Sequence, residues 1–142
     1  VLAAGGGRSD YFRALARSFI VSCDGAHAVH PNMGGKADPT SRPMLNGGVV
    51  IKLSANRSYT SDAVSGAAFM QVCEKAGVKV QRFVNRSDMR GGSTIGPISS
   101  THVSIASVDV GIPMLAMHSI RELCGVEDNL AMFKALLEFY SC

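Results

Sequence analysis

The residues best suited to chemistry stand where an apolar run meets a polar loop. Residues 19–23 are mostly apolar, Asp24 follows directly, and His27 and His30 come three and six residues later. Such a run is typical of a buried strand, and open α/β sheets bind ligands beyond the carboxyl ends of their strands. Carboxylate and imidazole groups can hold a metal ion or transfer protons. The pattern therefore predicts a functional site at this strand end.

His118 is a further candidate for this site, because it follows a predicted strand and a turn that contains Gly111 and Pro113. Loops at one edge of a sheet can converge, so His118 can lie near Asp24. Asp24 and His27 are too close in sequence to bind one metal ion from a continuing strand, but they can serve different roles. The pattern leaves open that each is only a capped strand end or a hydrogen-bonded structural residue.

Lys52 is unusual because it interrupts the apolar run of residues 49–53. It can be an outward-facing lysine of a half-buried strand or a cation placed to meet an acidic ligand, and the pattern allows both. Tyr59 can belong to the core or offer a hydrogen-bonding hydroxyl group. The glycine-rich residues 91–96 can line a substrate pocket, but they lack the Gly-Lys-Ser/Thr ending of a phosphate-binding loop. His102, in an apolar helical segment, is expected to be structural.

The composition limits the class of protein. The chain has 142 residues, a length sufficient for one domain with a hydrophobic core. Of these residues 46% are hydrophobic and 18% charged, as in ordinary globular proteins. Its net charge of +3 is not gathered in a Lys/Arg block, so we expect no nucleic-acid partner. The apolar runs are too short for a membrane span, so we expect no membrane partner. Four cysteines without a Cys-x-x-Cys pair are typical of reduced thiols, which predicts a cytoplasmic protein.

Strands and helices are expected to alternate, as in α/β proteins. The hydrophobic pattern predicts strands at residues 19–23, 49–54, 78–84 and 105–110, the last ended by Gly111 and Pro113. It predicts helices at residues 10–16, 62–76 and 127–140, and a short turn or helix at residues 99–103. The apolar spacing of the last helix predicts that it buries one stripe of side chains, namely Leu130, Phe133, Leu137 and Tyr140.

Five blocks of sequence closely resemble the aspartyl aminopeptidase family of dinuclear zinc exopeptidases. They include Ser-Cys-Asp-Gly-Ala-His from residue 22 and Ala-Met-His-Ser from residue 116, and they follow the family's order at residues 22–32, 42–43, 51–59, 92–97 and 116–122. The resemblance implies an α/β fold, a three-layer zinc-exopeptidase-like domain with a mixed sheet and flanking helices. It covers about the C-terminal third of such an enzyme. Residues 1–142 are thus expected to be the C-terminal portion of a catalytic domain, without the oligomerisation domain and the N-terminal catalytic portion, in agreement with a start at Val1.

The resemblance implies a role for nine residues of this chain. Asp24 is expected to bind one zinc ion and His118 the other. Substrate contacts are expected from seven residues, namely His27, Lys52, Tyr59, Ser93, Thr94, Gly96 and Met117. Lys52 is suited to an acidic side chain at the N-terminus of a peptide. Arg90 and Gly91 stand where the family usually has Pro-Cys, a departure that affects the fine contacts of this loop.

The implied function is that of a metallo-aminopeptidase that removes N-terminal Asp or Glu from peptides by two-zinc hydrolysis, as a homo-oligomer. Three of the five metal ligands and the general base of the family have no counterpart here. No catalytic residue is therefore expected in this chain, which alone is expected to be inactive. Two alternatives stay open: an aminopeptidase of this fold that prefers neutral residues, and a non-catalytic remnant that serves as a binding or assembly module. A missing N-terminal part also predicts exposed apolar surface or an unpaired strand edge.

Overall fold

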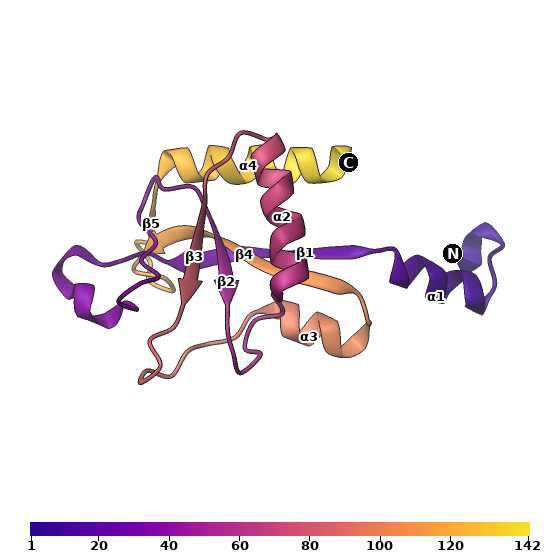
Figure 1. Ribbon diagram of the computed structural model, residues 1–142, viewed down its shortest axis with the longest axis horizontal. Helices are drawn as coiled ribbons and strands as arrows, with labels where there is room; N and C mark the ends of the chain where they lie inside the picture. The colour runs from indigo at the N-terminus through magenta and orange to yellow at the C-terminus, as the bar shows by residue number, and fades with distance from the viewer.

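The computed structural model describes residues 1–142, apart from the side chain of Leu2. In this described chain, a mixed sheet of five strands forms the centre (Figure 1). The order across the sheet is β1 (Phe19–His27), β4 (Ala106–Leu115), β2 (Val49–Leu53) and β3 (Val80–Val84), and β5 (Leu123–Cys124) pairs with β4. The structure confirms the α/β fold with a mixed sheet and flanking helices.

The register of the strands decides which side chains share a face of the sheet. β1 runs parallel to β4, with Asp24 beside Gly111, and β2 runs antiparallel to β4, with Val50 beside Gly111. β3 is parallel to β2. Successive side chains of a strand point to opposite faces. Asp24 of β1, Lys52 of β2 and Asp109 of β4 consequently lie on one face, and the core valines of β4 lie on the other.

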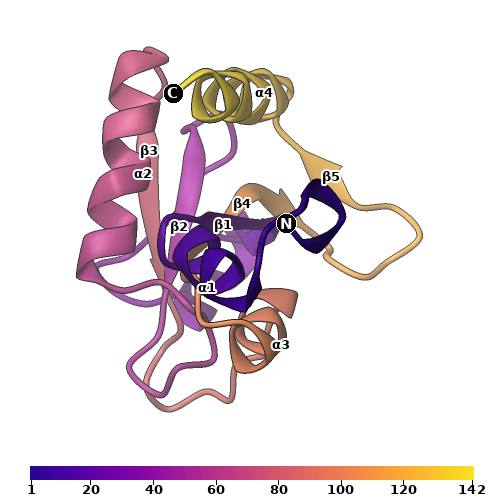
Figure 2. The ribbon, with the colours of Figure 1, turned by 90° about the vertical axis from the view of Figure 1, so that its right-hand side faces the viewer.

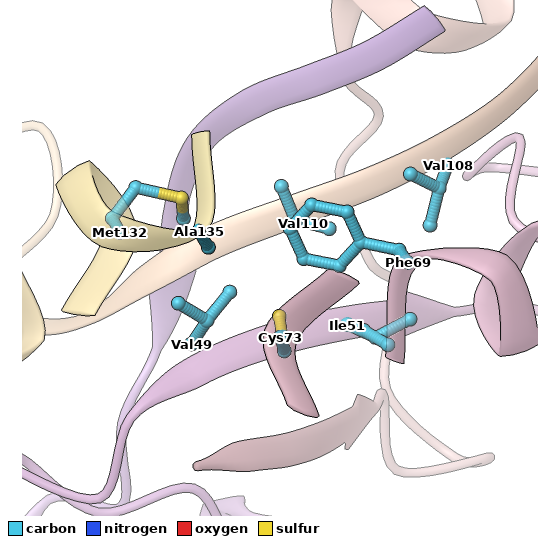
Figure 3. Packing of buried hydrophobic residues seen from close by; sticks show 8 residues of the cluster. All are labelled: Val49, Ile51, Phe69, Cys73, Val108, Val110, Met132 and Ala135. Atoms are coloured by element: carbon cyan, nitrogen blue, oxygen red, sulfur yellow. The ribbon is translucent and has the colours of Figure 1, made fainter. Parts of the chain in front are cut away.

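Two helices cover the face opposite to these charged residues. α2 (Ala63–Lys75) and α4 (Val126–Ser141) lie against it (Figure 2). Their buried side chains meet those of β2 and β4 in one hydrophobic cluster (Figure 3). The cluster consists of Val49, Ile51, Phe69, Cys73, Val108, Val110, Met132 and Ala135. α3 (Ile95–His102) packs on the other face, where a Cβ on its Gly96 would touch the side chain of Asp109.

α1 (Arg8–Ala16) projects from one end of the sheet, and its residues are all at least partly exposed (Figure 1). Two 3₁₀ helices, Leu2–Ala4 and Pro31–Lys36, are the other helical elements of the described chain. Among the described residues, no helix combines the length and the apolar composition needed to cross a membrane. The elements that position the site are the sheet and the helices packed on it, α2, α3 and α4.

α2 begins at a capping box. Asp62 accepts a hydrogen bond from the Ser65 N–H at 2.7 Å, and Ser65 Oγ accepts one from the Asp62 N–H at 3.0 Å. Gly77, with φ +67°, follows the end of the helix, where a left-handed residue is typical. The capping box fixes the start of α2 directly after the loop that carries Tyr59.

β4 is longer than the sequence pattern predicts. It continues through Gly111 and Pro113 to Leu115, and β1 continues beyond residue 23 to His27. The two strands pair along the whole of β1, which offsets the low strand propensity of glycine and proline. A Cβ at position 111 would lie 2.7 Å from the carbonyl carbon of Gly25, so glycine permits the close approach of the two strands. The prediction that this Gly/Pro pair ends the strand is wrong.

α4 buries a different face from the one that its apolar spacing predicts. Its buried residues are Asp128, Met132 and Ala135, whereas the predicted stripe is exposed, from 51% at Leu130 to 82% at Tyr140. The helix carries apolar residues on two faces, and spacing alone does not decide which face meets the sheet. The prediction of the buried stripe is therefore wrong, and α4 exposes an apolar surface, in agreement with the expectation of such a surface.

Candidate functional site

A cavity of about 480 Å³ lies on the sheet face that carries Asp24 and Lys52. It is bounded by the ends of β1 and β4, by the 3₁₀ helix Pro31–Lys36 and by the loops that precede α2 and α3. Eight of the nine residues implicated by the resemblance line it, namely Asp24, His27, Lys52, Tyr59, Ser93, Thr94, Met117 and His118. The fold thus brings together side chains that are far apart in sequence.

Lys52 is buried and paired. Its side chain is 3% exposed, and its ammonium group forms an ion pair with Asp24 Oδ1. Nζ also donates a hydrogen bond to the carbonyl oxygen of Gly25 at 3.2 Å and lies 5.4 Å from the centre of the Tyr59 ring. A buried ammonium group needs such partners, and the attraction to an aromatic ring adds to them. Lys52 is therefore not an outward-facing surface lysine.

Tyr59 forms one wall of the cavity and packs edge-on to Phe83, with the ring centres 6.3 Å apart. Burial is the main cause that raises the pKa of Tyr59. A side-chain hydrogen bond with Asn85 lowers the pKa, and the negative charges of Asp24 and Asp109 raise it. The phenol is therefore protonated at neutral pH, so it can donate a hydrogen bond to a ligand.

His27 lies beside the same aromatic ring, with its own ring centre 6.1 Å from that of Phe83. Partial burial is the main cause that lowers the pKa of His27, and the electrostatic effects of the neighbouring His118 and Lys52 lower it further. The imidazole is therefore neutral at pH 7, where one nitrogen donates and the other accepts a hydrogen bond.

The loop after β4 holds His118 in an uncommon backbone conformation. Ala116 and His118 have φ values of +54° and +70°, in the left-handed region. Each such non-glycine residue costs about 1–3 kcal/mol, and strain of this kind gathers at functional sites. The His118 N–H donates a hydrogen bond to Glu122 Oε1 at 2.5 Å, which helps to hold the loop. The loop thus presents His118 and Met117 to the cavity.

Asp24 and His118 offer oxygen and nitrogen ligands of the kinds that zinc binds. Asp24 exposes 42% of its side chain, so its carboxylate can also meet a ligand in the cavity. Among the described residues, however, no group of three or more His, Cys, Asp or Glu side chains could hold a metal ion. Because zinc sites take four or more ligands, the residues of this chain alone do not fit a complete zinc site.

Gly96 is the one residue of the nine implicated by the resemblance that does not line the cavity. It is buried in α3, where a Cβ would lie 2.6 Å from both carboxylate oxygens of Asp109. Its role as a substrate contact stays a prediction. The residue that the sequence reasoning missed is Asp109, a fully buried acid that interrupts the apolar run of β4. The same signal, a charged residue inside an apolar strand, pointed to Lys52.

The comparisons with known proteins show the family of this chain. The family model that matches residues 1–140 is described as Aminopeptidase I zinc metalloprotease (M18). The chain belongs to the M18 family of aminopeptidases.

Individual relatives agree with this family. The chain is 62% identical over 141 residues to a probable M18 family aminopeptidase 2 of Clostridium novyi, a match that covers 99% of this chain and 33% of the relative. The chain thus spans about a third of the length of the curated relatives that it matches.

Solved structures show the same fold. A chain in a cryo-EM structure of the Ape4 and Nbr1 complex has a TM-score of 0.89 and 37% identity, over 99% of this chain and 27% of that one. The S. cerevisiae mApe1 dodecamer has a TM-score of 0.81 and 29% identity over 92% of this chain and 28% of its own.

Proposed function

We propose that this chain forms the substrate-recognition part of an aminopeptidase that removes Asp or Glu from the N-terminus of peptides. The observation that carries the proposal is the buried ammonium group of Lys52 beside the cavity. An ammonium group has three N–H donors, and here two of them meet Asp24 and the carbonyl oxygen of Gly25. The third can meet an acidic side chain of the substrate, as a charge-assisted hydrogen bond.

The other residues of the cavity have roles that follow from their protonation and position. Asp24 and His118 would each hold one of two zinc ions, together with ligands from the rest of a longer protein, which would also supply the general base. The zinc ions, when bound, supply Lewis-acid activation of the scissile carbonyl group and of water. Neutral His27 and protonated Tyr59 orient the peptide by hydrogen bonds, and Ser93, Thr94 and Met117 form the pocket wall.

The complete protein is further proposed to be a homo-oligomer in the cytoplasm. The similar mApe1 was solved as a dodecamer, which supports an oligomer for this protein too. The thiols of Cys23, Cys73, Cys124 and Cys142 are all free, which suits a reducing compartment.

The proposal is tested with the protein at its natural full length, loaded with zinc. Peptides that begin with Glu, Asp or Leu are compared as substrates of the wild type and of Lys52→Leu. A charge-assisted hydrogen bond contributes about 1.5–3 kcal/mol, so kcat/KM for acidic peptides should fall roughly 10- to 150-fold more than for the Leu peptide. The control Lys52→Gln keeps a hydrogen-bond donor for Asp24 and should show the same selective loss in a folded protein.

Other outcomes have distinct meanings. An equal loss on acidic and neutral peptides in both variants would overturn the acidic specificity. A wild type that prefers the Leu peptide would be an aminopeptidase for neutral residues. A zinc-loaded wild type without turnover on any peptide would be a non-catalytic binding module.

A further inference from the structure

Asp109 lies in the middle of β4 with none of its surface exposed, on the sheet face that carries the cavity. A carboxylate buried in this way must be satisfied by hydrogen bonds. Asp109 Oδ2 accepts bonds from the Thr60 N–H at 2.6 Å and from Thr60 Oγ1 at 3.1 Å. Asp109 Oδ1 accepts a bond from Thr94 Oγ1 at 2.8 Å. The two oxygens therefore bind two different segments of the chain.

These two segments belong to two loops that line the cavity. Thr60 follows Tyr59 in the loop between β2 and α2, and Thr94 is the N-cap residue of α3, next to Ser93. The loops also meet directly, because Ser93 Oγ donates a hydrogen bond to the carbonyl oxygen of Ser58 at 3.1 Å. Tyr59, Ser93 and Thr94 all line the cavity. Asp109 thus joins both loops to β4.

The surroundings of Asp109 strengthen this attachment. Its N–H donates to Ser61 Oγ at 2.8 Å, and the Ser61 hydroxyl donates back to the Asp109 carbonyl oxygen at 3.3 Å. On the α3 side, Gly96 has no side chain where a Cβ would lie 2.6 Å from both carboxylate oxygens. The glycine therefore lets the start of α3 sit directly on the carboxylate. The closeness of Asp109 explains why residue 96 is a glycine, although Gly96 does not line the cavity.

We propose that Asp109 is a positioning residue for the substrate pocket. Its carboxylate holds the Tyr59 loop and the Ser93–Thr94 loop in one relative position, and so sets the shape of the cavity that both loops line. Asp109 does not touch the substrate and acts through Tyr59 and Thr94. The inference rests on the proposed function, in which these residues contact the peptide. Small displacements of positioning groups reduce turnover strongly, about 100-fold for 1 Å.

Asp128 provides a matched control for a purely structural role. It is also fully buried and accepts hydrogen bonds from two backbone N–H groups, those of Asn46 at 2.6 Å and of Gly48 at 2.8 Å. It joins a loop to α4, and neither Asp128 nor these two partners belong to the cavity lining. Asp109→Ala and Asp128→Ala therefore remove the same kind of group, one beneath the cavity and one away from it.

The experiment measures kcat and KM per folded molecule in the zinc-loaded, full-length protein, on whichever peptide the wild type cleaves. Asp109→Ala should lower kcat/KM about 10- to 100-fold, whereas Asp128→Ala should change it less than about twofold. Asp109→Asn is isosteric and keeps an oxygen for the Thr60 N–H, so it should restore most of the activity. Because Asp109→Ala can fail to fold, Thr60→Val and Thr60→Ser are measured as well. The valine variant should lower kcat/KM, and the serine variant should retain it.

Hydrogen exchange followed by mass spectrometry measures how firmly the two loops are held, and it does not depend on enzymatic activity. Asp109→Ala or, if it does not fold, Thr60→Val should speed exchange in residues 57–62 and 91–96, and Asp128→Ala should speed it in residues 44–48 instead. Unchanged exchange in both cavity loops, or equal kinetic losses in the Asp109 and Asp128 variants, would overturn the proposal. A wild type that cleaves no peptide refutes the proposed function, whereas a turnover that Asp109→Ala leaves unchanged refutes the role of Asp109 alone.

Discussion

Ser22 and Ser61 are both buried serines, yet the structure predicts opposite effects when each is replaced by alanine. Ser22, in β1, is 4% exposed, and its Oγ has no hydrogen-bond partner among the described residues. Ser61 is 6% exposed, and its Oγ accepts a hydrogen bond from the Asp109 N–H and donates one to the Asp109 carbonyl oxygen. Both substitutions remove a hydroxyl oxygen, so the difference between their effects on the free energy of unfolding measures the contribution of the Ser61 hydrogen bonds.

The magnitudes follow from the partners of each hydroxyl group. In the unfolded chain both hydroxyls bind water, and burying one without a partner costs about 1–3 kcal/mol. The Ser22 oxygen also makes dispersion contacts worth about 0.1–0.2 kcal/mol each. Ser22→Ala should therefore raise the free energy of unfolding by about 1 kcal/mol. Ser61→Ala leaves the Asp109 N–H buried without its acceptor and should lower the free energy of unfolding by about 1–3 kcal/mol.

Urea denaturation of the full-length protein measures both changes. All variants are compared at one protein concentration, because oligomerisation makes the apparent stability depend on concentration. An unchanged slope of the free energy against urea would show that the denatured state is the same. If Ser22→Ala destabilised the protein by as much as Ser61→Ala, the Ser22 hydroxyl would have a partner and the reasoning from its isolation would be refuted.

Three further substitutions test the elements around the site. Asp62→Ala removes the cap of α2 and should cost about 1 kcal/mol at neutral pH. The Ser65 N–H is the main cause that lowers the pKa of Asp62, so the part of this cost that depends on the carboxylate charge should be lost as the pH falls from 3.8 through the lowered pKa, in unfolding measured against pH. Gly111→Ala places a Cβ 2.7 Å from the backbone of β1 and should lower the free energy of unfolding, measured in urea, by about 1–3 kcal/mol. Gly66→Ala, inside α2, should raise the free energy of unfolding by about 0.5–1 kcal/mol, because beyond the backbone of its own helix no heavy atom of the described residues lies within 4 Å of the new Cβ.

The sequence predicts the elements of this fold better than it predicts their faces and ends. Apolar spacing identifies α4 as a helix, but Met132 faces the core while Leu137 is exposed, because two apolar faces satisfy the same period. Gly111 and Pro113 are strand-ending residues by propensity, yet β4 runs through them because it pairs with β1 over nine positions. Tertiary pairing, which the local sequence does not contain, decides both cases.

The candidate site shows the same limit. Asp24, Lys52 and His118 can be found from the sequence, because charged or imidazole groups stand out beside apolar runs and family blocks surround them. Asp109 gives a similar local signal, but its importance depends on partners 49 residues away at Thr60 and 15 residues away at Thr94. A pattern along the chain shows that a residue is unusual, and only the fold shows what it holds in place.

The pairing of Lys52 with Asp24 depends on the order and register of the strands. These residues come from β2 and β1, which are not neighbours, because β4 lies between them. At this crossing the residue of β4 is Gly111, which pairs with Asp24 on one side and with Val50 on the other. Glycine at position 111 lets β4 lie close to β1, because a Cβ there would lie 2.7 Å from the carbonyl carbon of Gly25. The flexible stem of Lys52 reaches across β4 to the Asp24 carboxylate, so the charged pair depends on a strand order that places these two residues on one face of the sheet.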